Sequence, residues 1–228
     1  MNRDAFLKRV REAAASGRRF AVHVRHDIDP RSGRADVGPD LPARYVEEIS
    51  KVGGRATVVG SLEAARAEVV NLLRLYEPRS ALCWKSPTLD KLGLQALLDG
   101  QRIERIDFDS LQLLSRDAQR AKFLSADIGI TGVTAAIAET GSLLMAHGPG
   151  NERLASLVPP VHIALVERSQ MVADLFDVFE QQPSLNTPAG VPSNVTFITG
   201  PSKTGDIEMK LVTGVHGPGK FHVIIIDA

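Results

Sequence analysis

Apolar residues recur at helical spacing in several segments of the chain, and short apolar runs lie between these segments. This alternation is typical of helices that follow buried strands. The helices are expected at residues 4–15, 41–52, 62–76, 89–98, 133–141, 153–157, 171–179 and 207–215. The strands are expected at residues 55–59, 81–84, 126–132, 142–146, 161–166, 195–199 and 221–226, with a strand and a helical turn within 103–114. The pattern predicts an α/β fold with three α/β/α layers and a mostly parallel or mixed sheet.

The N-terminal part of the chain differs from the rest. After the first expected helix, which ends at Gly17, residues 18–42 are rich in charge and poor in apolar side chains. We interpret 1–42 as a helix followed by an extended polar arm, and 43–228 as one α/β domain. The arm contains four residues of metal-ligating types: His23, His26, Asp27 and Asp29. No rigid element is predicted to hold them, so a solvated arm without a metal site is expected.

A polar turn follows the expected strand at 195–199, which is interpreted as buried. Gly200 and Pro201 break this strand, and Ser202 or Thr204 then suits the N-cap of the expected helix, with Asp206 in its first turn. Backbone N–H groups, two hydroxyls and Lys203 would meet at this turn, as in sites for anions or polar ligands. The alternative is that these residues form only a cap and a turn, with Lys203 in solvent.

Glu139 is expected at the C-terminal end of the helix 133–141. The helix dipole disfavours a carboxylate there, so Glu139 either points to solvent or is held for a function. Its neighbours Thr140, Gly141 and Ser142 are small enough to let a ligand approach. The connection from Gly132 to Gly141 is short for a parallel crossover, which favours a mixed sheet.

These two polar segments are predicted to meet. Open α/β sheets bind ligands beyond the carboxyl ends of their parallel strands. We therefore expect Gly132 and residues 139–142 to lie at that edge beside the turn 200–204, lining one pocket with Lys203 near its mouth. If the segments lie at opposite ends of the strands, both are only caps and turns.

Composition and charge exclude several classes of protein. Lys and Arg number 27, as do Asp and Glu, so no net charge attracts the chain to nucleic acid or to anionic lipid. No apolar run is long enough to span a membrane, and the N-terminus lacks the apolar core of a signal peptide. A cytoplasmic location is expected.

Cysteine and histidine add little chemistry. The single cysteine, Cys83, lies in an apolar run, so a buried and inert thiol is expected. An iron–sulfur cluster held by this chain alone is excluded, because such clusters need about four thiolates. His162 and His216 are interpreted as structural residues, and the common nucleotide-binding motifs are absent from the sequence.

A two-part C-terminal signature and three central motifs nevertheless resemble those of one family. Residues 200–208 and 211–218, GPSKTGDIE and LVTGVHGP, look like the C-terminal signature of the LUD-domain family, lactate utilisation protein C group. Three central motifs of that family resemble 130–132, 137–142 and 160–163, in the same order. The resemblance covers about 43–228 and implies a fold similar to the NagB/RpiA/CoA-transferase group. It also implies participation in the oxidation of L-lactate to pyruvate with iron–sulfur partner subunits.

Three hypotheses follow from these observations. The leading one is a non-redox subunit of a lactate-oxidising complex that binds a small anionic or organic ligand, holds no cofactor itself and relies on partner subunits for iron–sulfur clusters. The second is a stand-alone acyl- or CoA-transferase, because glutamate before glycine is the nucleophile in CoA transferases of similar fold and Glu139 precedes Thr140 and Gly141. The third is a regulatory or scaffold module.

Overall fold

The computed structural model describes residues 2–18, 34, 36–181, 192–205 and 211–228. The chain forms two compact units, Met1–Arg34 and Ala35–Ala228. The first contains helix α1 (Arg3–Gly17), which confirms the expected N-terminal helix; Asn2 caps it by accepting a hydrogen bond from the Asp4 N–H. None of its residues is buried. The four metal-ligating types of the polar arm lie outside the described residues.

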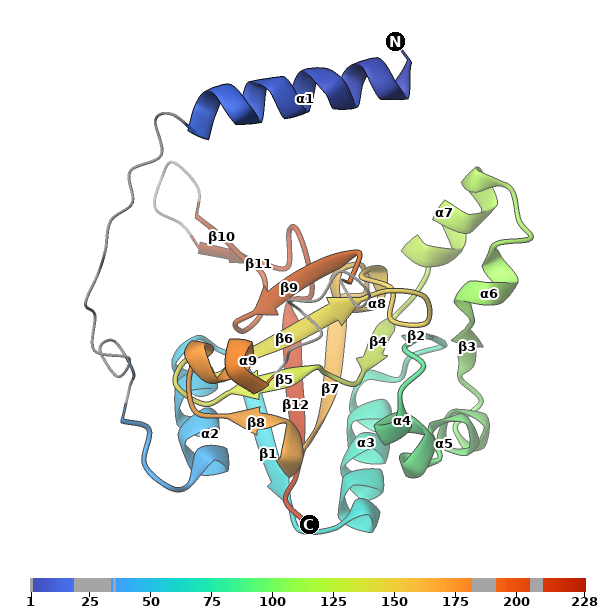
Figure 1. The fold of residues 1–228 in the computed structure, drawn as a ribbon. Coiled ribbons are helices and arrows are strands. Elements are labelled where there is room, and N and C mark those ends of the chain that lie inside the picture. The colour runs from blue at the N-terminus through green and yellow to red at the C-terminus, as the bar shows by residue number, and fades with distance from the viewer. Residues whose placement is uncertain (1, 19–33, 35, 182–191, 206–210) are drawn as a thin grey trace. The chain divides into compact units, whose positions relative to one another are not determined.

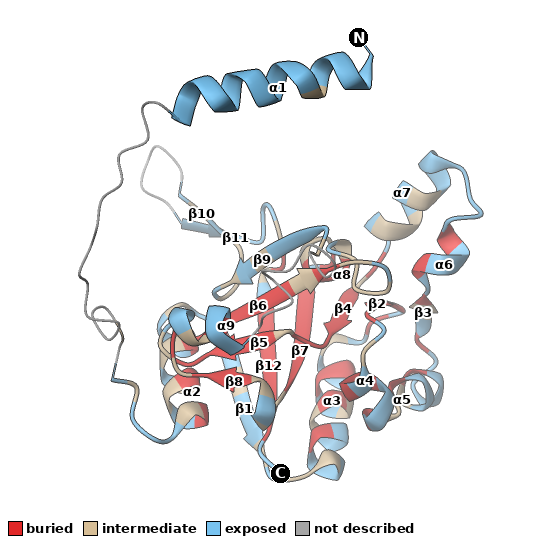
Figure 2. Cartoon of the chain, viewed as in Figure 1, coloured by how far each residue is buried: buried red, intermediate tan, exposed pale blue. Residues whose placement is uncertain are grey.

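A parallel sheet of six strands forms the centre of the second unit (Figure 1). Its strand order is β1-β12-β7-β4-β2-β3, and every neighbouring pair is parallel. The strands are β1 (Arg55–Val59), β2 (Ser80–Cys83), β3 (Glu104–Ile106), β4 (Ile128–Thr131), β7 (Val161–Glu167) and β12 (Lys220–Ile226). The central strands are buried along almost their whole length, which explains their continuous apolar runs (Figure 2).

Different elements cover the two faces of this sheet. Adjacent residues of a strand point to opposite faces. In β12, Phe221 lies next to Gly54 and Ile49, whereas His222 bonds to Tyr76. The face that carries Phe221 is therefore covered by α2 (Leu41–Lys51) and by α8 (Leu154–Leu157), which contacts β4. The face that carries His222 is covered by α3 (Leu62–Tyr76). The helix α4 (Pro87–Leu92) contacts α3, and α5 (Leu94–Gly100) contacts α4.

A second, smaller sheet lies on the α2 face. Its order is β8-β5-β6-β9, formed by β8 (Met171–Val172), β5 (Ala135–Ile137), β6 (Ser142–His147) and β9 (Asn194–Ile198). Leu143 and Met145 join the main core, while Leu144 packs with Val178 of α9 (Leu175–Gln181) in a separate cluster. The α/β class and the mostly parallel central sheet are thus confirmed, and the small sheet supplies part of the second covering layer.

The remaining described elements are short. They are α6 (Phe108–Leu111), α7 (Arg116–Leu124), the 3-10 turn Arg168–Gln170, β10 (Lys203–Gly205) and β11 (Leu211–Thr213). The strand and helical turn expected within 103–114 are confirmed by β3 and α6, whereas α7 had no counterpart in the sequence prediction. Gly93, at φ 69°, divides the expected helix 89–98 into α4 and α5. The expected helix 171–179 begins as β8 and becomes helical only at Leu175.

Two expected helices are strands. Residues 135–137 form β5, which pairs with β6 through a turn at 138–141. In the expected helix 207–215, residues 211–213 instead form β11, in which Thr213 pairs with Lys203 and Leu211 with Gly205, while residues 206–210 lie outside the described residues. Leu211 and Val215, whose helical spacing favoured the helix, are 69% and 53% exposed. Without a core to cover these side chains, nothing favours the helix over the paired strands.

The strand at 195–199 is confirmed as β9, but it is not buried. It is the edge strand of the small sheet, and Val195 and Phe197 are exposed. Among the described residues, no helix combines the length and the apolar character needed to cross a membrane.

Candidate functional site

Segments that are far apart in the sequence meet at one cavity of about 200 Å³, here called the motif pocket. It lies against the first residues of β7 and β12, at the amino ends of the parallel strands. The described residues that line it are Ser156, Leu157, His162, Thr196, Phe197, Ile198, Thr199, Gly200, Ser202, His216, Gly217, Pro218 and Phe221. The sequence motifs at 160–163, 200–208 and 211–218 each contribute to this lining.

The two C-terminal motifs hold each other by backbone contacts. The Ser202 N–H donates to the Pro218 carbonyl at 2.9 Å, and the Gly214 N–H donates to the Ser202 carbonyl at 2.9 Å. A Cβ at Gly217 would lie 3.3 Å from the Ser202 Cβ, so glycine permits this close approach. These backbone hydrogen bonds fix the position of Ser202. The residues after it form the strand Lys203–Gly205, so the expected role of Ser202 or Thr204 as a helix N-cap is wrong.

His162 gives the pocket an unsatisfied polar atom. It is fully buried on β7, and its Nε2 lies 2.8 Å from the Thr131 Oγ1. Its ring packs beside Phe221, with centroids 5.3 Å apart. Nδ1 has no hydrogen-bond partner among the described residues. The prediction of a satisfied structural histidine therefore holds for one ring nitrogen and is wrong for the other.

The electrostatic state of His162 follows from its burial. Desolvation lowers the pKa of His162 to about 3, so the imidazole is neutral near neutral pH. A neutral imidazole has one donor and one acceptor nitrogen, and only one of them is used here. A buried polar atom without a partner is costly, so Nδ1 is an unusual feature at the wall of this pocket.

The segment 140–142 is linked to Thr199, which follows β9 and precedes the turn 200–204. The Thr140 Oγ1 donates to the Ser142 Oγ at 2.7 Å, and the Ser142 Oγ lies 2.6 Å from the Thr199 Oγ1. Gly141 has a positive φ of 63°, and a Cβ there would lie 2.5 Å from the Ile49 backbone nitrogen. Gly141 is therefore required for packing against α2. Of the predicted ligand-binding residues, Gly200 and Ser202 line the motif pocket itself.

Glu139 lies in the turn between β5 and β6, so its expected place at a helix C-terminus is wrong. Its backbone N–H donates to the Ala173 carbonyl at 2.9 Å, and the residue is half-buried. It is not among the residues that line the motif pocket. Its catalytic role stays a prediction.

The remaining predicted residues lie elsewhere. Lys203 does not line the motif pocket; its Nζ would be 3.5 Å from a Cβ built on Gly53. Thr204 pairs with Val212 in the hairpin, and Asp206 lies outside the described residues.

Gly132 follows β4 at the carboxyl end of the sheet, where a Cβ would meet the Ser86 Oγ at 2.6 Å. The expectation of one pocket at the carboxyl edge is therefore wrong, because Gly132 is at that edge while Gly200 and Ser202 lie at the amino ends.

Comparison with known proteins identifies the chain's relatives. The family model described as LUD domain matches residues 43–226. Lactate utilization protein C of Halalkalibacterium halodurans is 32% identical over 99% of this chain and 97% of that protein. Lactate utilization protein B of Bacillus subtilis is 36% identical over 54% of this chain, but the match covers only 26% of that protein.

A solved structure supports the fold. The crystal structure of a DUF162 family protein from Deinococcus radiodurans matches with a TM-score of 0.57 and 21% sequence identity, covering 82% of this chain and 96% of that one. At that identity the likeness concerns the fold alone. With a family match over 43–226 and a relative aligned over nearly its full length, the chain belongs to the LUD domain family.

Proposed function

We propose that this protein is a non-redox component of a lactate utilisation system, and that it binds an organic ligand in the motif pocket. A relative named lactate utilization protein C, matched over nearly the whole chain, supports the biological setting. The single observation that carries the ligand site is the buried His162 Nδ1, which has no partner among the described residues where the motifs meet.

The lining narrows the chemistry of the ligand. Hydroxyls, imidazoles and apolar side chains line the described part of the pocket, and none of these lining residues is lysine, arginine, aspartate or glutamate. An unpaired anion buried there would be strongly disfavoured. The portion of the ligand inside the pocket is therefore uncharged, with a hydrogen-bonding group that reaches His162. This favours the organic ligand over the small anion among the two kinds expected from the sequence.

The redox step belongs to partner subunits in this proposal. Oxidation of L-lactate to pyruvate removes two electrons and two protons, which an acceptor must take. The chain has one cysteine, Cys83, and burial raises the pKa of its thiol to about 12. One buried thiol does not provide the ligand set of an iron–sulfur cluster. We therefore assign the clusters to partner subunits that bind this chain.

Growth on L-lactate tests the proposal in the native host. A strain lacking this gene should fail to grow on L-lactate, and the wild-type gene should restore growth. His162→Gln and Ser202→Ala should restore it poorly, although both proteins are present in folded form. Ser110→Ala, an exposed serine on α6 outside the motif pocket, is the matched control and should restore full growth. Normal growth of the deletion strain on L-lactate would refute the proposed role.

Purification tests the division of labour. Protein isolated from the native host after mild cross-linking should retain cysteine-rich subunits that contain iron and acid-labile sulfide. The isolated chain should not reduce an artificial electron acceptor with L-lactate as donor. Sustained L-lactate oxidation by the isolated chain would show that the redox step does not depend on a partner.

A further inference from the structure

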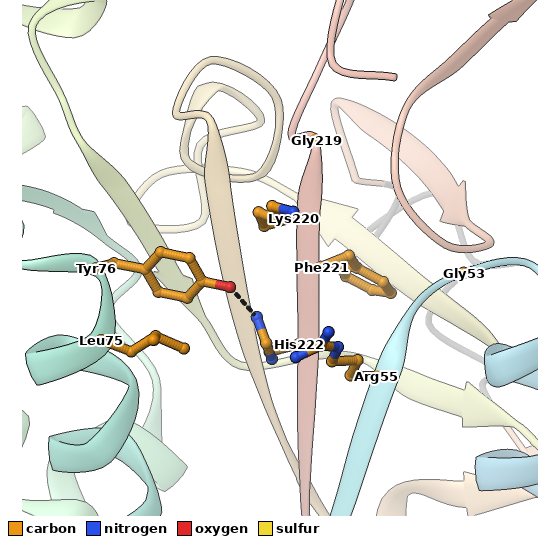
Figure 3. A pocket seen from close by; sticks show the side chains of 8 residues that line it. All are labelled: Gly53, Arg55, Leu75, Tyr76, Gly219, Lys220, Phe221 and His222. Carbon is orange, nitrogen blue, oxygen red and sulfur yellow. Dashed lines mark hydrogen bonds between the residues drawn. The ribbon is translucent and has the colours of Figure 1, made fainter. Parts of the chain in front are cut away.

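A second cavity, of about 310 Å³, lies on the other face of β12 and is here called the basic pocket (Figure 3). Figure 3 shows Leu75 and Tyr76 approaching it from α3, Arg55 from β1, and Lys220 and His222 from β12. Lys220 and His222 alternate with Phe221, which lines the motif pocket as well. The two pockets therefore adjoin at the amino end of β12, while their polar groups lie on opposite faces of the sheet.

Cations gather at the basic pocket, and none of the described residues that line it is a carboxylate. Arg55 and Lys220 line it, and neither forms an ion pair with another described residue. Lys203 does not line the cavity, although its Nζ would be 3.5 Å from a Cβ on Gly53, which does. Like charges that converge on a concave surface repel one another and favour the entry of an anion.

A neutral hydrogen-bonding pair forms the inner wall. The Tyr76 hydroxyl lies 2.7 Å from the His222 Nε2, and their rings meet edge to face. Burial lowers the pKa of His222, and the positive charges of Arg55 and Lys220 lower it further. The negative charge of Glu68 on α3 raises the pKa of His222 instead. Glu68 does not line the cavity, and its carboxylate accepts a hydrogen bond from the Asn71 side chain at 3.4 Å.

We infer that the basic pocket is a binding site for a compact oxyanion, the phosphate or carboxylate group of a small molecule, held by Arg55 and Lys220. The guanidinium of Arg55 can donate two parallel hydrogen bonds to such a group, and the ammonium of Lys220 adds a second positive charge. Tyr76 and His222 close the inner side without adding a negative charge that would repel the ligand. This site is independent of the ligand assigned to the motif pocket.

Titration of the full chain with inorganic phosphate, and separately with L-lactate, tests the inference and distinguishes the two sources of an oxyanion. At low ionic strength, where screening is weak, the NMR signals of the His222 ring should shift and saturate with at least one of them. The His162 ring, in the adjoining motif pocket, is the internal control and should not shift. Unchanged His222 signals with both anions would overturn the inference.

Paired variants separate a built site from a general effect of charge. Arg55→Gln combined with Lys220→Gln should weaken binding of the responding anion by about tenfold or more, a loss of about 1.4 kcal/mol. Arg116→Gln combined with Arg120→Gln makes the same change in net charge on the exposed surface of α7 and should leave affinity unchanged. An equal loss in both pairs would overturn the site. Growth on L-lactate with the His162 variants tests the motif pocket separately, so failure of either proposal can be recognised.

Discussion

Thr131 and His162 are hydrogen-bonded across two neighbouring parallel strands, with 2.8 Å between the hydroxyl oxygen and the imidazole Nε2. Both residues are fully buried, and they lie on the same face because His162 is paired with Gly129, two residues before Thr131. The bond orients the imidazole, and Nδ1 has no hydrogen-bond partner among the described residues.

Burial of His162 makes stability depend on pH. Its pKa is about 3 in the folded chain, whereas an unfolded histidine titrates near about 6.5. Between these values only the unfolded chain binds the proton, so the stabilisation is complete above the unfolded pKa and is lost as pH falls towards the folded one. For each pH unit by which the pH falls within this window, we expect protonation of His162 in the unfolded chain to lower the free energy of unfolding by up to about 1.4 kcal/mol.

Urea denaturation as a function of pH measures this effect. His162→Gln should remove that part of the slope that the wild type shows. Parallel curves for the wild type and His162→Gln would contradict the assignment of the slope to His162.

Gly129 is required by the contact between β4 and α8. A Cβ at this position would lie 1.8 Å from the Ala155 carbonyl oxygen, which belongs to the backbone and cannot rotate away. Gly129→Ala should therefore destabilise the protein by about 3 kcal/mol or more, as expected for an overpacked core. Gly60→Ala is the matched control, because nothing lies within 4 Å of its Cβ, and it should be almost neutral. Both are measured by chemical denaturation, and equal stabilities would disprove the steric explanation.

The hydroxyl chain through Ser142 links the β5–β6 turn to the end of β9. Ser142→Ala and Thr199→Val should each lower stability by about 1 kcal/mol, because each leaves a partner hydroxyl without its bond. The double variant should lose less than the sum of the two single losses, since both changes remove the same interaction. A double-mutant cycle measures this coupling, and strictly additive losses would show that the hydroxyls do not interact.

Glu139 can be tested directly for the acyl-transfer alternative. Because it lies in a turn and does not line the motif pocket, we expect no covalent adduct when the protein is incubated with a panel of acyl-CoA thioesters. Intact-protein mass spectrometry checks this, with Glu139→Gln treated in parallel. An adduct that forms on the wild type and disappears in Glu139→Gln would instead support the nucleophile.

Cys83 should be inert in the folded protein. Its thiol is buried on β2, and desolvation raises its pKa to about 12, so almost no thiolate exists near neutral pH. A thiol-specific reagent should react slowly with the native chain and rapidly after denaturation. Fast modification of the native protein would show that the strand opens readily.

Local signals in the sequence determined several elements of this fold. The helix 62–76 was predicted at its observed bounds from its apolar residues at helical spacing and from Pro78, which stops it. The structure adds that the Ser61 side chain caps its start. The strands at 55–59 and 161–166 were also predicted from their apolar runs. The burial of Cys83 was predicted in the same way and is confirmed. These features depend on neighbours within a few residues, and that information is present in the linear pattern.

Only the tertiary structure decided the features that depend on distant partners. Residues 135–137 are a strand because they pair with β6 and β8, although their alanines suit a helix equally well. Ser202 reaches the motif pocket through bonds to Gly214 and Pro218. The Nδ1 of His162 has no partner among the described residues, and this depends on the packing around it. The cavity that His162 lines is built from three motifs that are separate in the sequence. Such pairings are fixed by the free energy of packing the whole chain, which local propensity does not encode.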